Sequence, residues 1–138
     1  MNSTDIKAAP PMTPHEASQL SAAALAYLGD CVLEIQVREK LIRDGVKSPS
    51  VASLEYVTAE AQCRALEKIL PLLTENESDM FRRGRNSVHS GVPRHATPSQ
   101  YRRATGLECL LGYLYMTGES ERIRELFCVG FADDNAGE

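Results

Sequence analysis

The sequence predicts an all-α protein, a compact helical bundle. Apolar residues recur at intervals of three and four along most of the chain, which is the spacing of one face of a helix. No stretch alternates apolar and polar residues over a useful length, and no Asn-Gly or Asp-Gly turn lies between two β-branched runs. We therefore expect six or seven packed helices and no sheet.

The first predicted helices begin at Thr13-Pro14-His15-Glu16. Thr13 is a favoured capping residue, proline is favoured at the first helical position, and a glutamate at the third completes a capping box. The apolar pattern runs on to Ile42, and Asp44-Gly45 supplies a stop. This stretch is long enough for a short helix followed by a longer one, with a break between residues 19 and 22.

The second half of the chain shows the same kinds of signal. Ser48-Pro49-Ser50 opens a helix whose apolar residues step by threes and fours as far as Ile69, and Pro71 ends it. Thr74 caps the next helix, with acidic residues in its first turn. The remaining predictions are a loop over residues 87–99 rich in Gly, Pro and Ser, a helix from Thr97 to about Met116, and a last helix over residues 120–131.

The length of 138 residues fits one domain with a real core. We expect a flexible tail over residues 1–13, a folded domain over residues 14–131 and a frayed end over residues 132–138. No secretion signal or membrane span is predicted, because the first residues lack a basic region and Asp30 interrupts the apolar run after Ala22. The cytoplasm is the expected location, with no membrane contact.

The four cysteines are far apart, and none forms a Cys-x-x-Cys pair. Each lies among apolar neighbours, so we expect four small core residues in a reducing compartment, with no disulfide or zinc site. The cysteines are Cys31, Cys63, Cys109 and Cys128.

Charge is distributed unevenly along the chain. The net charge is −4, which argues against a general nucleic-acid binder. However, residues 80–107 contain six arginines and no acidic residue, which leaves nine basic residues against 19 acidic ones elsewhere. A basic segment on an acidic body predicts a local anion-binding site, although a solvated helix face followed by a loop is the simpler alternative.

Two carboxylates lie within two of the most apolar stretches, Asp30 in residues 24–34 and Glu108 in residues 105–114. A lone ionised carboxylate in apolar surroundings costs several kcal/mol unless it is paired, protonated or bound to a metal. If these stretches are helices that pack together, the two acids can share one Mg²⁺ or Mn²⁺, with Glu34 one turn beyond Asp30. The alternative is that the acids pair with arginines, for example Arg38, Arg64 or Arg102.

The basic segment favours a phosphate-binding role beside such a metal site. Arginine presents forked donors that match phosphate, and hydroxyl and amide groups in the loop can donate to the backbone of duplex RNA. An acidic metal site with an arginine-rich neighbour indicates phosphodiester hydrolysis. The candidate RNA-binding residues are Arg82, Arg83, Arg85, Asn86, Ser90 and Arg94, with Gln62 and Tyr101 as candidates that could equally be structural.

Three motifs resemble the catalytic domain of the ribonuclease III family. Residues 24–34, which contain Tyr-Leu-Gly-Asp, resemble its signature helix. The Gly-Arg-Asn-Ser-x-x-Ser-Gly run at residues 84–91 resembles its basic loop, and residues 105–112 resemble its second acidic helix. The resemblance extends over about residues 18–130. The chain is similar to the short bacterial form, Mini-ribonuclease III, which has no separate double-stranded-RNA-binding domain.

The resemblance implies roles for particular residues. Asp30 and Glu108 fall on the family's metal-binding, catalytic positions. The longer enzymes carry two further acids, where this chain has Ala26 and Thr105. The short form is similar in lacking them, so activity is still implied, but a full second metal site is not. Glu34 would then be an outer helper.

The resemblance also implies a function and a partner. It implies a homodimer that pairs through the signature helix and cuts both strands of double-stranded RNA, leaving 5′-phosphate and 3′-hydroxyl ends. The implied task is trimming of the large-subunit (23S) ribosomal RNA precursor, in which a ribosomal protein could assist.

Two other functions stay open from the sequence. The first is a catalytically inactive relative that only binds RNA or the ribosome, which the missing acids at Ala26 and Thr105 support. The second is an all-α metal-dependent nucleotide pyrophosphohydrolase. Enzymes of that class use Glu-x-x-Glu and Glu-x-x-Asp pairs, which Asp30, Glu34 and a solitary Glu108 fit badly.

Overall fold

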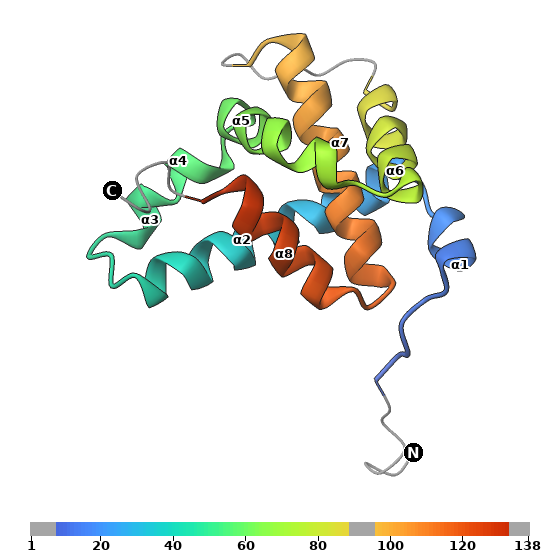
Figure 1. The fold of residues 1–138 in the computed structure, drawn as a ribbon, viewed down its shortest axis with the longest axis horizontal. Helices are drawn as coiled ribbons and strands as arrows, with labels where there is room; N and C mark the ends of the chain where they lie inside the picture. Colours follow the sequence, from blue (N-terminus) through green and yellow to red (C-terminus); the bar gives the residue numbers. More distant parts are fainter. Residues whose placement is uncertain (1–7, 89–95, 133–138) are drawn as a thin grey trace.

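The computed structural model describes residues 8–88 and 96–132, and within these ranges it contains helices and no strand (Figure 1). This confirms the predicted all-α class. The elements are α1 (Pro14–Ser18), α2 (Ala22–Arg43), α3 (Pro49–Ala52), α4 (Leu54–Val57), α5 (Ala59–Ile69), the 3₁₀ helix η2 (Leu70–Leu72), α6 (Glu75–Asn86), α7 (Pro98–Met116) and α8 (Ser120–Gly130).

Side-chain caps explain where most of these helices begin. In α1 the Thr13 hydroxyl accepts a hydrogen bond from the Glu16 amide, and the Glu16 carboxylate accepts one from the Thr13 amide, both at 3.1 Å. The same reciprocal arrangement begins α6 at Thr74 and α7 at Thr97. Each such pair satisfies two amides that a helix would otherwise leave unpaired. The predicted starts at residues 13, 74 and 97 are therefore confirmed.

The predicted single helix after Ser48 is wrong, because the structure divides it into α3, α4 and α5. Thr58 causes the second division. Its backbone is extended, with φ −67° and ψ 155°, and its hydroxyl accepts a hydrogen bond from the Ala61 amide at 3.1 Å. A threonine that caps the next helix competes with continuation of the previous one. The described residues consequently form eight α-helices, rather than six or seven.

The core forms where α7 crosses α2 near the centre of the bundle, with α6 packed on α7 and with α5 and α8 beside them (Figure 1). Fully buried leucines from several helices meet there. The cysteine prediction is only partly right, since Cys109 is buried and Cys63 half-buried, whereas Cys31 and Cys128 are exposed. Cys31 has apolar neighbours because it lies on an outward face of α2 that is itself apolar.

Two glycines bring the backbones of α2 and α7 into direct contact. A Cβ atom on Gly29 would overlap the carbonyl oxygen of Glu108, and a Cβ atom on Gly112 would overlap the carbonyl oxygen of Leu25. Each helix thus places a glycine against the other helix's backbone. Because Asp30 directly follows Gly29, this crossing sets Asp30 beside Glu108.

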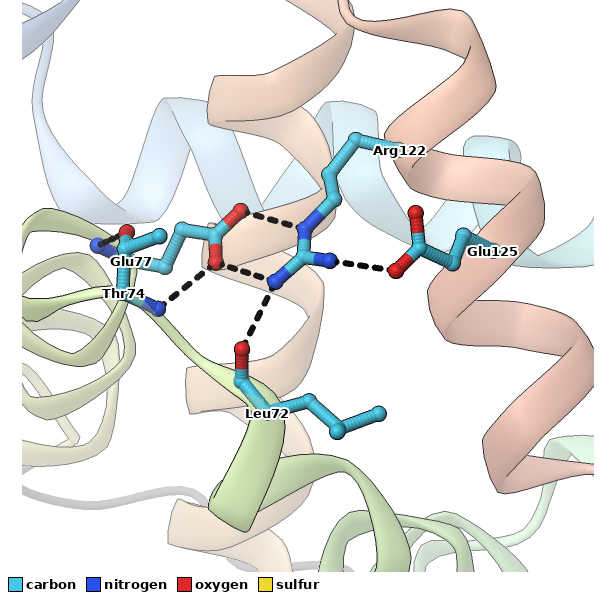
Figure 2. A network of polar contacts seen from close by, with 5 residues as sticks. All are labelled: Leu72, Thr74, Glu77, Arg122 and Glu125. Atoms are coloured by element: carbon cyan, nitrogen blue, oxygen red, sulfur yellow. Dashed lines mark hydrogen bonds and ion pairs between the residues drawn. The ribbon is translucent and has the colours of Figure 1, made fainter.

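A buried ion pair anchors α6 to α8 (Figure 2). The Arg122 guanidinium donates from Nε and Nη2 to both oxygens of Glu77, at 2.9 and 2.8 Å, and Glu77 is only 6% exposed. Nη2 also donates to the Leu72 carbonyl at 2.8 Å, and Nη1 donates to Glu125 at 2.7 Å. This bidentate geometry is the strong form of an arginine–carboxylate pair.

The environment of Glu77 keeps it ionised. Burial opposes ionisation, but hydrogen bonds from Arg122 and Thr74 outweigh burial and hold the pKa of Glu77 below its usual 4.5. The hydrogen bond to Glu77 also raises the pKa of Arg122. The pair therefore stays charged at neutral pH and fixes the start of α6, the helix that carries Arg82, Arg83 and Arg85.

Two residues of the predicted N-terminal tail lie against the end of α7. The Met12 amide donates to the Met116 carbonyl at 2.8 Å, and Pro11 lies against Gly118. Within the described ranges, none of the helices combines the length and the apolar character that crossing a membrane requires.

We predict that Gly29→Ala weakens the fold severely, because the added methyl group must displace the Glu108 backbone. The expected loss in the free energy of unfolding is at least about 3 kcal/mol, measured by urea denaturation. Gly45→Ala is the control. Its Cβ atom would meet no atom within 4 Å, so only the backbone strain at φ 70° remains, which is about 1 kcal/mol. Equal losses in the two variants would contradict the close crossing.

Candidate functional site

A cavity of about 610 Å³ lies where α2 meets the start of α7 and the residues that follow α6. Asp30 from α2 and Glu108 from α7 both line it, and we call it the acidic cavity. Its other lining residues are Ala23, Ala26, Tyr27, Ser87, Val88, Tyr101 and Thr105. The structure thus brings together two carboxylates that are 78 positions apart in the sequence.

The two carboxylates lie in different surroundings. Asp30 is exposed, whereas Glu108 is half-buried. Asp30 is therefore not enclosed in the way that its apolar neighbours suggested. Those neighbours belong to the core face and to the outward face of α2, with Asp30 between the two. Of the two acids, only Glu108 therefore bears the free-energy cost of burying a carboxylate.

Glu108 holds its proton unusually well. Burial is the largest cause of its raised pKa. A hydrogen bond to Asp30 and the negative charge of Asp30 raise the pKa further, to about 8. The Gln62 side chain acts in the opposite direction by hydrogen-bonding to the ionised form. At neutral pH and without a cation, Glu108 is therefore largely protonated.

Gln62 lies behind Glu108 instead of on the surface. It is 4% exposed, and its Nε2 donates to the Val57 carbonyl at 3.1 Å, where α4 gives way to α5. Its Oε1 is buried and has no hydrogen-bond partner among the described residues. Such an orphaned acceptor next to a carboxylate marks a polar interior that can take a further donor, such as water.

Two further residues of the cavity wall are those at which the resemblance implies acids in longer relatives. Ala26 and Thr105 both line the cavity. The Thr105 hydroxyl donates to the Tyr101 carbonyl at 2.8 Å, and the Ser87 hydroxyl donates to the Gly84 carbonyl at 2.7 Å. These two hydroxyls are therefore engaged with the backbone.

The arrangement fits one divalent cation bound by few protein ligands. The described residues contain no group of three or more His, Cys, Asp or Glu side chains that could hold a metal. Mg²⁺ typically takes one or two carboxylates, water and substrate phosphates, so a pair of acids in an open cavity suits it. The negative charge of Asp30, which contributes after burial to the raised pKa of Glu108, is one that a bound cation would offset.

Neither acid forms an ion pair within residues 8–88 and 96–132, so the proposed pairing with arginine is not observed there. Arg38 pairs instead with Glu34 at 3.5 Å, and Arg64 pairs with Glu60 at 3.0 Å. Glu34 is not among the residues that line the acidic cavity.

The candidate arginines of α6 have three different environments. Arg82 is exposed and pairs with Asp79 one turn before it. Arg83 donates to the Ser18 carbonyl at 2.9 Å and to the Leu20 carbonyl, and so it anchors the link between α1 and α2. Arg85 lies over the Phe81 ring, with its guanidinium carbon 5.7 Å from the ring centroid.

Two further candidates, Ser90 and Arg94, lie outside the described residues. Asn86 accepts a hydrogen bond from Arg85 Nε at 3.2 Å, and Tyr101 lines the acidic cavity. Sequence reasoning missed the position of Gln62 behind Glu108. Ala61, Ala65 and Leu66, which share its helix face, were the signal that could have placed it in the interior.

We predict that Glu108 in the metal-free protein titrates near pH 8, as measured by carboxyl-carbon NMR. Asp30→Asn should lower this pKa, because it removes the neighbouring charge, but not to 4.5, since burial remains. Gln62→Leu should raise it further. Glu77 is the internal control, with a pKa below 4.5. A Glu108 pKa near 4.5 that is the same in the unaltered protein and in Asp30→Asn would contradict this description of the site.

Comparison with known proteins identifies the family. Residues 23–119 match the family model of the ribonuclease III domain. Mini-ribonuclease 3 of Symbiobacterium thermophilum is 44% identical over 110 residues, which cover 78% of this chain and 85% of that protein. Mini-ribonuclease 3 of Enterococcus faecalis is 41% identical over 113 residues, which cover 78% of this chain and 86% of that protein.

A solved structure shows the same fold. The crystal structure of a protein from Fusobacterium nucleatum superimposes with a TM-score of 0.74 at 27% identity, covering 83% of this chain and 95% of that one. The resemblance to ribonuclease III that the three motifs indicated is thus confirmed. The chain belongs to the ribonuclease III family and, within it, to the Mini-ribonuclease 3 group.

Proposed function

We propose that the protein is a metal-dependent endoribonuclease that hydrolyses phosphodiester bonds in double-stranded RNA. The observation that carries this proposal is the acid pair in the acidic cavity. Burial and the neighbouring Asp30 raise the pKa of Glu108 to about 8, and no cationic side chain among the described residues pairs with either acid. Membership of the Mini-ribonuclease 3 group supports the same reaction.

Asp30 and Glu108 would hold the ion, with Mg²⁺ as the expected metal and Mn²⁺ as a substitute. Bound there, the ion supplies a Lewis acid beside the scissile phosphate. Because Ala26 and Thr105 offer no carboxylate to the cavity, we propose one ion per site. Glu34 has no direct role in this proposal, since its partner is Arg38.

The reaction is displacement at phosphorus. A water molecule attacks the phosphate, the bond to the 3′ oxygen breaks, and the products carry a 5′-phosphate and a 3′-hydroxyl. The protein's part is to bind and orient the duplex. Arg82 and Arg85 would hold the backbone beside the cavity, and Tyr101 would contact the strand at its wall. Arg83 contributes by fixing α6 to the N-terminal segment.

The proposed substrate is the precursor of large-subunit (23S) ribosomal RNA, which the membership of the Mini-ribonuclease 3 group supports. The proposed location is the cytoplasm. We also propose that a ribosomal protein helps to place the cut.

We also propose that the active form is a homodimer joined through α2. Tyr27, Ile35 and Ile42 are 82%, 64% and 72% exposed, and their spacing puts them on one face of α2. We call these three residues the α2 stripe, and exposed large apolar residues that share one helix face are typical of an interaction surface. Asp30 lies beside this stripe on the same helix, so pairing through it would place two acidic cavities next to the dimer interface.

The second candidate is a relative that binds RNA without cutting it. Its support is the presence of Ala26 and Thr105 in the cavity where longer enzymes have acids. The two functions differ in one observable, which is cleavage of bound duplex RNA when Mg²⁺ is added.

We predict that the protein cuts long duplex RNA in Mg²⁺ and that Asp30→Asn slows cutting by about 10³-fold or more. Sequencing of the product ends locates the cuts. Asp44→Asn is the matched control, because Asp44 makes only an exposed pair with Lys40 on the same helix and should leave the rate unchanged. Binding without cutting by the unaltered protein would favour the second candidate. Full activity of Asp30→Asn would remove Asp30 from the site.

We predict that Ile35→Glu converts the dimer into a monomer, because it places charge in an apolar interface. Analytical ultracentrifugation gives the mass, and circular dichroism checks that the helices remain. Tyr115→Glu on α7 is the control, since Tyr115 is also exposed but lies off the α2 stripe. A monomeric unaltered protein would disprove pairing, and a dimeric Ile35→Glu would show that it uses another surface.

A further inference from the structure

A second cavity, of about 450 Å³, lies on the other side of the junction between α6 and α7. The polar groups that line it are those of Arg85, Asn86, Ser99, Arg102 and Arg103, over a floor that includes Phe81. No lining residue among those described is acidic. We call it the arginine cavity.

Two of its three arginines are held in place by the protein. Arg85 is stacked over Phe81, and its Nε donates to Asn86, so its Nη atoms are left without a hydrogen bond to any described residue. Arg103 donates from Nη2 to Glu67 at 2.8 Å and is about one-third exposed. Groups that are fixed before binding lose less entropy when a ligand arrives.

Arg102 is exposed and makes no ion pair or hydrogen bond with the described residues. Together, the three guanidinium groups, the Asn86 amide and the Ser99 hydroxyl form a concave set of hydrogen-bond donors. Of these three arginines, only Arg103 forms an ion pair with a described residue, which is Glu67, a residue that does not line the cavity. Phosphate is the anion that arginine forks match best, and the apolar floor strengthens the attraction by lowering the local dielectric constant.

The arginine cavity adjoins the acidic cavity. Asn86 and Ser87 are consecutive, and each lines a different cavity, as do the consecutive residues Tyr101 and Arg102. Along α7, Arg102 lies six residues before Glu108, which is about 9 Å along the helix axis. One nucleic-acid backbone that passes over the junction of α6 and α7 could therefore meet both cavities.

We propose that the arginine cavity is a second phosphate-binding site for the RNA, which binds a backbone phosphate away from the scissile one and so sets the register of the cut. This inference rests on the proposed function and extends it to Ser99, Arg102 and Arg103. We assign the phosphate to a polynucleotide, because the consecutive residues 86 and 87, and again 101 and 102, line one cavity each, so a long backbone can reach both.

The test is Arg102→Gln, which removes one charge from an exposed position without disturbing the pair of Arg103 with Glu67. Affinity for a synthetic RNA duplex is measured by fluorescence anisotropy in EDTA at several salt concentrations. We expect about a tenfold loss of affinity and a salt slope that is smaller by about one unit. Arg102→Lys should keep the slope but lose part of the affinity, since it retains the charge without the fork.

Arg124→Gln on α8 is the matched control, because Arg124 is exposed and lies in neither cavity, although it lines a separate pocket between α2 and α8. It should leave the affinity and the slope unchanged. In Mg²⁺, sequencing of product ends should show cuts that spread over neighbouring positions in Arg102→Gln. An unchanged affinity, slope and cut position in Arg102→Gln would overturn the inference.

Titration with inorganic phosphate separates the possible sources of the anion. If phosphate shifts the Arg102 side-chain NMR signals while Arg102→Gln binds RNA normally, the cavity takes a free anion and the inference is wrong. Equal competition by polyglutamate would point to an acidic protein and would also overturn it. If the unaltered protein does not cut duplex RNA, the proposed function is wrong. The RNA affinities of the unaltered protein and of Arg102→Gln would still show whether the arginine cavity binds a backbone phosphate.

Discussion

Gly29 and Gly112 let α2 and α7 touch backbone to backbone, and this contact determines where the two site acids lie. Asp30 follows one of these glycines, and Glu108 supplies the backbone that the other helix meets. Side chains larger than hydrogen at these positions would push the helices apart by the width of a methyl group or more. The acid pair is thus a property of the helix crossing, which the buried core around Leu33 and Leu110 holds together.

Contacts outside this crossing fix the position of the arginine-bearing helix α6 relative to α2 and α7. Arg122 fastens the start of α6 to α8 through Glu77, and Arg83 fastens its second half to the segment between α1 and α2. Arg122 binds a buried carboxylate and Arg83 binds two backbone carbonyls, so both arginines have a structural role. Because α6 is held at two points, Arg85 and Asn86 lie at a fixed place beside the start of α7.

Local signals made the helical class predictable, because capping boxes at Thr13, Thr74 and Thr97 depend only on residues three positions apart. The proximity of Asp30 and Glu108 was also expected, from two apolar stretches that had to pack on each other. The environments of individual arginines were not predictable. Whether a guanidinium binds a carbonyl, as Arg83 does, or stacks on a ring, as Arg85 does, depends on contacts with residues that are near only in the folded chain.

The internal engagements of the arginines have a consequence for how the protein would respond to its ionic environment. Arg82 pairs with Asp79, Arg103 pairs with Glu67, and Arg83 is covered by backbone carbonyls. A polyanion sheds its condensed counterions only where protein charge is available to replace them. Each protomer would therefore release fewer counterions from RNA than the number of arginines in residues 80–107 suggests. Its affinity for RNA would depend more on the shape and hydrogen bonds of the binding surface than on net electrostatic attraction.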